Sequence, residues 1–111
     1  MKNILIHKLE LFLPNNTAVD RKASFDVKDR LIHYYGGYTT LIGGGEWVDY
    51  SQTRHSDNIL CLVSYSSRLI DPDSWEKILR ILYPNEKAFL VVVDGIGYLY
   101  EEDEEHVRPS Q

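Results

Sequence analysis

The chain has 111 residues, and its composition, 43% hydrophobic and 26% charged, is typical of one globular domain with a buried core. A formal charge of −5 argues against a general binder of nucleic acid or membrane surfaces, because such proteins need a basic field to displace counterions. The single cysteine, Cys61, excludes an internal disulfide and a multi-cysteine metal site. The sequence has no apolar run near the ~20 residues that span a bilayer and no signal-peptide pattern, so we expect a cytoplasmic protein.

The N-terminal third of the sequence predicts a strand followed by a helix. From Ile4 to Leu13, leucines alternate with polar residues, which is the period-2 pattern of a half-buried strand. The helix is expected to begin near Thr17 or Asp20, since either side chain can cap exposed amides, and to end at Gly36-Gly37. The apolar stripe of this helix consists of Ala23, Val27, Leu31 and Tyr34.

The middle of the sequence predicts two strands separated by a loop. β-Branched and aromatic residues favour a strand from Tyr38 to Ile42. The glycines Gly43-Gly44-Gly45 predict a bulge or a bend, after which residues 46–49 resume an extended conformation. Residues 50–58 are polar and are typical of a loop, whereas the apolar run 59–63 suits a strand buried on both faces.

A second helix and a hairpin complete the predicted domain. Asp71 is a good N-cap and Pro72 fits the first helical position. Residues 88–93 form another buried strand, and Asp94-Gly95 predicts a tight hairpin to a return strand over 96–100. The apolar stripe of the second helix consists of Trp75, Ile78, Leu79 and Leu82.

This order of elements predicts the fold class. It is α+β, the ferredoxin-like β-α-β-β-α-β arrangement with a terminal β-hairpin and two helices on one face of an antiparallel sheet. Residues 1–100 are expected to form one domain, and residues 101–111 an acidic, flexible tail. The other sheet face, expected to carry Phe12 and Thr40, would be uncovered in one chain, so we expect a homo-oligomer.

Several short motifs resemble a family of small bacterial and phage proteins with a GG-x-T…G-x-G-x-W core and a late N/Q-E-x-A…D-G segment. The resemblance covers most of positions 4–100, although the third glycine and Ser56-Asp57 depart from the family pattern. It carries no established reaction, and it implies at most a phage-borne role. The matching segments are Leu11-Phe12-Leu13-Pro14, Gly36-Gly37-Tyr38-Thr39, Gly43-Gly44-Gly45-Glu46-Trp47, Asn85-Glu86-Lys87-Ala88 and Asp94-Gly95.

Aromatic residues near the glycines are the main signal for a ligand site. They are typical of a core or a subunit interface, and the alternative is a pocket that stacks a planar ring while an arginine binds a phosphate. The glycine run matches neither a Walker loop nor a dinucleotide fingerprint, but its backbone amides could approach a ligand. The candidate ligand-binding residues are Tyr38, Gly43, Gly44, Gly45, Trp47, Arg54 and Arg68.

Catalytic and metal-binding signals are weak. The four histidines, His7, His33, His55 and His106, share no metal-ligand spacing, so no metal or other cofactor is expected. Cys61 lies in an apolar run and is typical of a buried, inert thiol, although a pair with His7 across neighbouring strands is conceivable.

Three functions therefore remain open. The leading hypothesis is a non-enzymatic, oligomeric binding protein, of a phage type that counters bacterial defence by sequestering a nucleotide-derived signal. The second is a protein-interaction inhibitor that uses the sheet face or the acidic tail. The third is a small enzyme with a cleft on the sheet face, whose best acid–base candidates are His7, His33 and Glu46.

Overall fold

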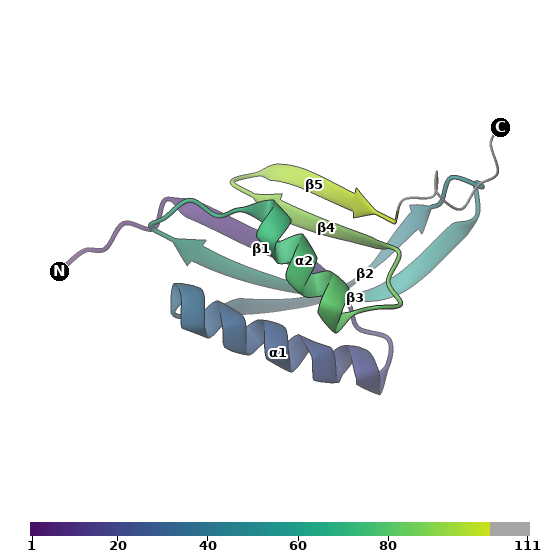
Figure 1. Ribbon diagram of the computed structural model, residues 1–111, viewed down its shortest axis with the longest axis horizontal. Coiled ribbons are helices and arrows are strands. Elements are labelled where there is room, and N and C mark those ends of the chain that lie inside the picture. Colours follow the sequence, from purple (N-terminus) through teal and green to yellow (C-terminus); the bar gives the residue numbers. More distant parts are fainter. Residues whose placement is uncertain (103–111) are drawn as a thin grey trace.

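The computed structural model describes residues 1–102, which form two helices and five strands (Figure 1). The strands pair antiparallel throughout, in the order β2-β3-β1-β4-β5. The predicted α+β class with an antiparallel sheet is therefore confirmed. In chain order the elements are β1 (His7–Pro14), α1 (Ala18–Tyr35), β2 (Thr39–Val48), β3 (Arg54–Ser66), α2 (Pro72–Leu82), β4 (Ala88–Val93) and β5 (Ile96–Glu101).

Local sequence signals set the ends of both helices. The Thr17 side chain accepts a hydrogen bond from the amide of Asp20, whose carboxylate accepts from the Thr17 amide in return, which completes a capping box for α1. Gly36 ends α1 with a φ of 87°, a left-handed conformation that glycine adopts without a Cβ penalty. The Asp71 carboxylate caps α2 by accepting from the amide of Asp73 at 3.0 Å.

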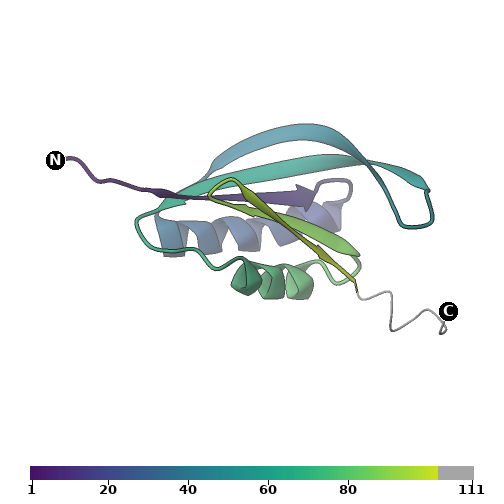
Figure 2. The same cartoon turned by 90° about the horizontal axis from the view of Figure 1, so that it is seen from above.

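Both helices lie on one face of the sheet (Figure 2) and cover the core. Leu11 of β1 and Leu62 of β3 are directly paired, and both side chains are fully buried beneath the helices. Trp75 of α2 is also buried, and its indole N–H donates to the hydroxyl of Tyr35 at 2.9 Å. The prediction that Tyr34 faces the core is wrong, because its side chain is exposed and Tyr35 packs there instead.

The hairpin of β2 and β3 is longer than the sequence indicates. The predicted bulge at residues 43–45 is absent, since Gly43, Gly44 and Gly45 pair in unbroken register with Ile59, Asn58 and Asp57. The predicted loop over 50–58 is also too long, because β3 already begins at Arg54. Polar side chains continue this strand because they pair with β2 in a region that no helix covers.

Register assigns each strand residue to one face of the sheet. Phe12 lies next to the core residue Leu11 and therefore points to the face without helices, called the open face below. Thr40 pairs with Leu62 and so lies on the helix side, contrary to expectation. The predicted β4–β5 hairpin is present, with positive φ at both Asp94 and Gly95.

Other boundaries differ by a few residues. β1 begins at His7 rather than Ile4, because residues 4–6 have no partner strand. The predicted tail from residue 101 begins inside β5, and residues 103–111 lie outside the part of the chain that the structure describes. Neither described helix combines the length and the apolar character that a membrane span requires.

Candidate functional site

The outer half of the β2–β3 hairpin forms one wall of a pocket. Residues 44–48 and 54–58, called the arm below, form strand pairs with each other and with no third strand of residues 1–102, since β1 reaches along β3 no further than Ile59. The arm extends past the ends of both helices (Figure 2). Between it and the β4–β5 end of the sheet lies a pocket of about 990 Å³, lined on the open face by Phe12, Ile59, Leu90 and Leu99. This volume suits a small organic ligand.

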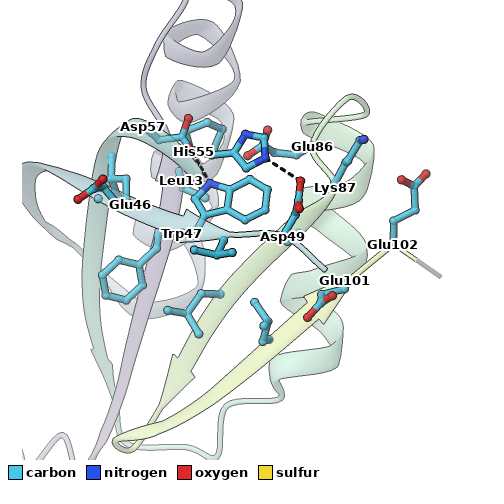
Figure 3. A pocket seen from close by; sticks show the side chains of 18 of the residues that line it. Leu13, Glu46, Trp47, Asp49, His55, Asp57, Glu86, Lys87, Glu101 and Glu102 are labelled. Atoms are coloured by element: carbon cyan, nitrogen blue, oxygen red, sulfur yellow. Dashed lines mark hydrogen bonds and ion pairs between the residues drawn. The ribbon is translucent and has the colours of Figure 1, made fainter. Parts of the chain in front are cut away.

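Trp47 has the largest side chain among the aromatic residues that line this pocket (Figure 3). Its indole ring stacks on the imidazole of His55, with ring centroids 4.3 Å apart and an angle of 17° between the planes. Its Nε1–H donates to the carboxylate of Asp57 at 2.8 Å. The indole therefore has a fixed orientation while 40% of Trp47 stays exposed. Binding of a planar ligand to this ring would therefore cost little additional side-chain entropy, because the two contacts already restrict the indole.

The turn between β2 and β3 holds the imidazole in place. Asp49 accepts hydrogen bonds from the amides of Ser51 and Thr53 and from the Ser51 hydroxyl, and its other oxygen accepts from Nε2–H of His55 at 2.9 Å. These donors hold the pKa of the Asp49 carboxyl below its usual range, the Ser51 hydroxyl first. Asp49 thus stays ionised and fixes the ring that lies behind Trp47.

The pocket is strongly acidic. Among the described residues that line it, six carry a carboxylate and one is a lysine: Glu46, Asp49, Asp57, Glu86, Glu101 and Glu102 against Lys87. Such a wall attracts cations and repels phosphate groups. Glu86 differs from the exposed Glu101 and Glu102 because it is partly buried. Burial, with the charges of Asp57 and Asp20 adding to it, raises the pKa of the Glu86 carboxyl.

The sequence-predicted ligand residues are divided between this pocket and other places. Gly45 and Trp47 line the pocket, whereas Gly43 and Gly44 do not. Arg54 begins β3 with an exposed guanidinium group 3.8 Å from Glu46, outside the lining.

Tyr38 and Arg68 also lie outside the pocket lining. The Tyr38 ring lies beside the ammonium group of Lys28 on α1, 5.9 Å from the ring centroid. Arg68 follows β3, and its amide donates to the Ser66 hydroxyl at 3.0 Å. The structure therefore brings together two of the seven candidates, Gly45 and Trp47.

Gly45 is the tightest of the three arm glycines. A Cβ atom at this position would lie 2.7 Å from Cδ1 of Ile59, whereas at Gly44 the nearest atom is the Asp57 carbonyl oxygen at 3.6 Å, and at Gly43 nothing lies within 4 Å. Of the three arm glycines, Gly45 is therefore the one at which packing leaves no room for a side chain. The tight fit arises from packing of the Ile59 side chain across the arm, and no glycine here needs a positive φ.

The acid–base candidates from the sequence lie apart from one another. His7 Nδ1 is 2.8 Å from the Asp94 carboxylate at the β4–β5 turn. His33 lies near the end of α1, against the ring of Tyr34. Of the three, only Glu46 lines the pocket in the described part of the chain.

Register also separates Cys61 from His7. Cys61 pairs with Phe12 on the open face, whereas His7 pairs with Ser66 on the helix side, so the conceivable pair between them is absent. Burial raises the pKa of the Cys61 thiol, which favours the thiol over the nucleophilic thiolate. Within residues 1–102, no group of three or more His, Cys, Asp or Glu side chains is arranged to hold a metal ion.

Sequence reasoning missed Asp49, His55, Asp57 and Glu86 as parts of one site. Three of these residues are brought to Trp47 by the pairing of the arm, in which His55 is opposite Trp47 and Asp57 opposite Gly45. The signal was the turn-forming stretch 49–53, where an aspartate precedes Ser51 and Thr53. A tight turn there places Trp47 and His55 at equivalent positions of the two strands.

Comparisons with known proteins bear on the fold. No protein-family model matches the sequence, and no curated protein does. Among solved structures, a phage SAM lyase in complex with S-methyl-5′-thioadenosine has a TM-score of 0.58 at 8% identity, covering 87% of this chain and 90% of that chain. A phage SAM lyase in the apo state has a TM-score of 0.57 at 10% identity, covering 93% and 96%. At such identities the likeness shows a shared fold.

Proposed function

We propose that this protein binds S-adenosylmethionine (SAM), or a closely related adenosyl sulfonium, in the pocket between the arm and the β4–β5 end of the sheet, and cleaves it to S-methyl-5′-thioadenosine. The observation that carries the proposal is the fixed, half-exposed indole of Trp47 inside an acidic pocket. The shared fold with a phage SAM lyase supports the choice of ligand.

Charge narrows the ligand class. The sequence suggested a nucleotide-derived molecule whose phosphate would meet an arginine, but the pocket lining contains no arginine among the described residues and six carboxylates. An adenosyl sulfonium such as SAM keeps the nucleoside and has no phosphate. Its sulfur and its ammonium group are positive and its one carboxylate is negative, so the molecule is a net cation. It is therefore the nucleotide-derived class that this electrostatic environment favours.

Trp47 supplies the contact for the base. One face of the indole is covered by His55, and its N–H is bonded to Asp57, so the remaining face presents an ordered surface to the pocket. Stacking of a nucleobase on such a ring contributes about 1–3 kcal/mol. The adenine of SAM and that of methylthioadenosine meet this surface equally.

The reaction breaks the bond between the sulfonium sulfur and the γ-carbon of the methionine part. The bonding electron pair stays on sulfur, which leaves as the neutral thioether of methylthioadenosine. The γ-carbon forms a new bond to oxygen at the same time: either to the ligand's own carboxylate, which closes a lactone, or to water, which gives the hydroxy acid and releases a proton. Positive charge on sulfur disappears along this path. Carboxylates directly beside the sulfur would therefore stabilise the substrate more than the transition state, and the productive place for them is around the amino-acid end.

The test is to incubate the purified chain with SAM and follow both products by chromatography and mass spectrometry. We expect methylthioadenosine to accumulate, and the mass of the four-carbon fragment shows whether water has been added. Trp47→Ala should weaken ligand binding by about 5- to 150-fold, the loss of one stacking contact. Phe25→Ala, the loss of an exposed ring on α1, is the matched control and should bind normally. Normal binding by Trp47→Ala would contradict the site.

A second candidate is sequestration without cleavage, which the acidic lining itself favours, because carboxylates stabilise the bound cation as long as it stays intact. The same incubation separates the two. SAM recovered unchanged after denaturation of the protein by cold acid supports sequestration. Conversion beyond that of SAM incubated without protein supports the lyase. Either activity would withdraw SAM from a host cell, which is the phage-type anti-defence role that we propose.

Two further features belong to this proposal. The strand order β2-β3-β1-β4 with two intervening helices supports the ferredoxin-like arrangement, with β5 as an added edge strand. The open face carries Leu41 and Leu99 as exposed apolar residues beside Phe12, which supports a homo-oligomer. Light scattering on the full chain measures its mass, and a monomer at micromolar concentration would contradict the oligomer.

A further inference from the structure

Glu86 is a partly buried carboxylate that has no bonded partner among the described residues. Its backbone is fixed, because its amide donates to the Tyr83 carbonyl at 3.1 Å in the turn that leads from α2 to β4. Its side chain lines the pocket (Figure 3). Among residues 1–102, no hydrogen-bond donor and no cation is bonded to this carboxylate. A charge that is partly removed from water normally has such a partner.

The other partly buried carboxylates of the pocket are occupied. Asp57 accepts from the Trp47 indole, and Asp49 accepts from His55 and the turn. The exposed Glu46 lies 3.8 Å from the Arg54 guanidinium. Nearby charge makes the position of Glu86 less favourable still, because Asp57 and Asp20 both repel its ionised form. No cation of the described part of the chain forms an ion pair with Glu86, although Lys87 lines the same pocket.

We propose that Glu86 is the specificity-determining residue that binds the ammonium group at the amino-acid end of the ligand, with the adenine on Trp47; this inference rests on the proposed function. An ammonium group fits because it donates up to three hydrogen bonds, whereas a sulfonium donates none. The Glu86 carboxylate is already partly desolvated in the folded protein. Binding an ammonium group therefore costs less free energy for removing water from the carboxylate than it would at an exposed position. Trp47 comes from β2 and Glu86 from the turn before β4, so the two ends of the ligand contact different parts of the fold.

The experiment compares three ligands by calorimetry on the full chain. SAM and S-adenosylhomocysteine both carry the ammonium group, whereas methylthioadenosine lacks the amino-acid part. We expect Glu86→Gln to weaken binding of SAM and of S-adenosylhomocysteine by about 10- to 100-fold, the loss of a charged hydrogen-bonded pair, and to leave methylthioadenosine within about threefold. Trp47→Ala should weaken all three ligands alike.

Glu101→Gln is the matched control, because it removes a carboxylate from the same lining at an exposed position. It should weaken the two ammonium ligands by less than about fivefold. Equal effects of Glu86→Gln on all three ligands, or no effect on any, would overturn the inference. A loss for SAM with none for S-adenosylhomocysteine would also overturn it, since Glu86 would then contact the sulfonium. If none of the three ligands binds the wild-type chain, the proposed function itself fails.

Discussion

Replacing Gly45 with alanine tests whether packing across the arm accounts for the glycine. In an extended strand, replacing glycine with alanine raises the free energy of unfolding by about 0.5–1 kcal/mol, because alanine loses less backbone entropy on folding. The gain should appear in full at Gly43, where a new Cβ meets nothing within 4 Å. At Gly45 the new Cβ would lie 2.7 Å from Cδ1 of Ile59, so that side chain must leave its rotamer at a cost of about 0.5–1.5 kcal/mol.

Thermal unfolding of the two variants measures the difference. We expect Gly43→Ala to raise Tm and Gly45→Ala to lie about 0.5–1.5 kcal/mol below it, roughly 2–12 °C in Tm for a chain of this size. Ile59→Val removes the clashing Cδ1, so the double variant Gly45→Ala/Ile59→Val should recover about 0.5–1.5 kcal/mol relative to the sum of the single changes. Equal stabilities of the two alanine variants, together with a coupling of zero, would refute the packing explanation.

Three further changes test the fold and its electrostatics. Asp71→Ala should lower stability by about 1 kcal/mol, because the amides at the start of α2 lose their cap; chemical denaturation measures it, and an unchanged midpoint would contradict the assignment. The His7 hydrogen bond lowers the pKa of Asp94, so this group stabilises the fold above its unfolded pKa of about 3.8, and the contribution is lost as pH falls through the folded pKa. Asp94→Asn should therefore melt lower than wild type at pH 7 and show a smaller loss in acid; parallel Tm curves would contradict this. Burial raises the pKa of Glu86, so its stabilising contribution is present below an unfolded pKa of about 4.5 and is lost as pH rises through the folded value. Glu86→Gln should melt higher than wild type at pH 7, with the difference vanishing in acid; a lower Tm at pH 7 would show that the carboxylate has a stabilising partner.

The elements that the sequence predicts well have signals confined to a few neighbouring residues. Asp71-Pro72 marks the start of α2 to the residue, and Asp94-Gly95 marks the turn between β4 and β5. Residues 54–58 are extended only because they pair with residues 44–48, and both faces of the arm lack helices, so no apolar alternation marks this strand. Pairing between two strands depends on residues that are separated in the sequence, so a short stretch of sequence read by itself does not reveal it.

The same limit applies to the candidate site. Trp47 was identifiable as an aromatic residue beside glycines, and the structure does place it in the pocket. The sequence marks Glu86 only as part of a motif. Its significance depends on burial and on the lack of a bonded cation among residues 1–102, which are properties of tertiary structure. The sequence pattern favours Arg54 and Arg68 as partners of a phosphate. It does not place carboxylates around Trp47, because their positions depend on the pairing of the arm.

The arm has a consequence for how the pocket opens. Its ten residues are joined to each other by one two-stranded ladder, and neither helix of residues 1–102 packs on them, so their amides should exchange with solvent far faster than those of β1. At its inner end the arm is attached by backbone and side-chain hydrogen bonds between Asn58 and residues 15–16. Fraying of the arm therefore separates Trp47 from Glu86 without unfolding the core. A bound ligand that contacts both Trp47 and Glu86 would oppose this fraying. Slower amide exchange confined to the arm would therefore report that the pocket is occupied.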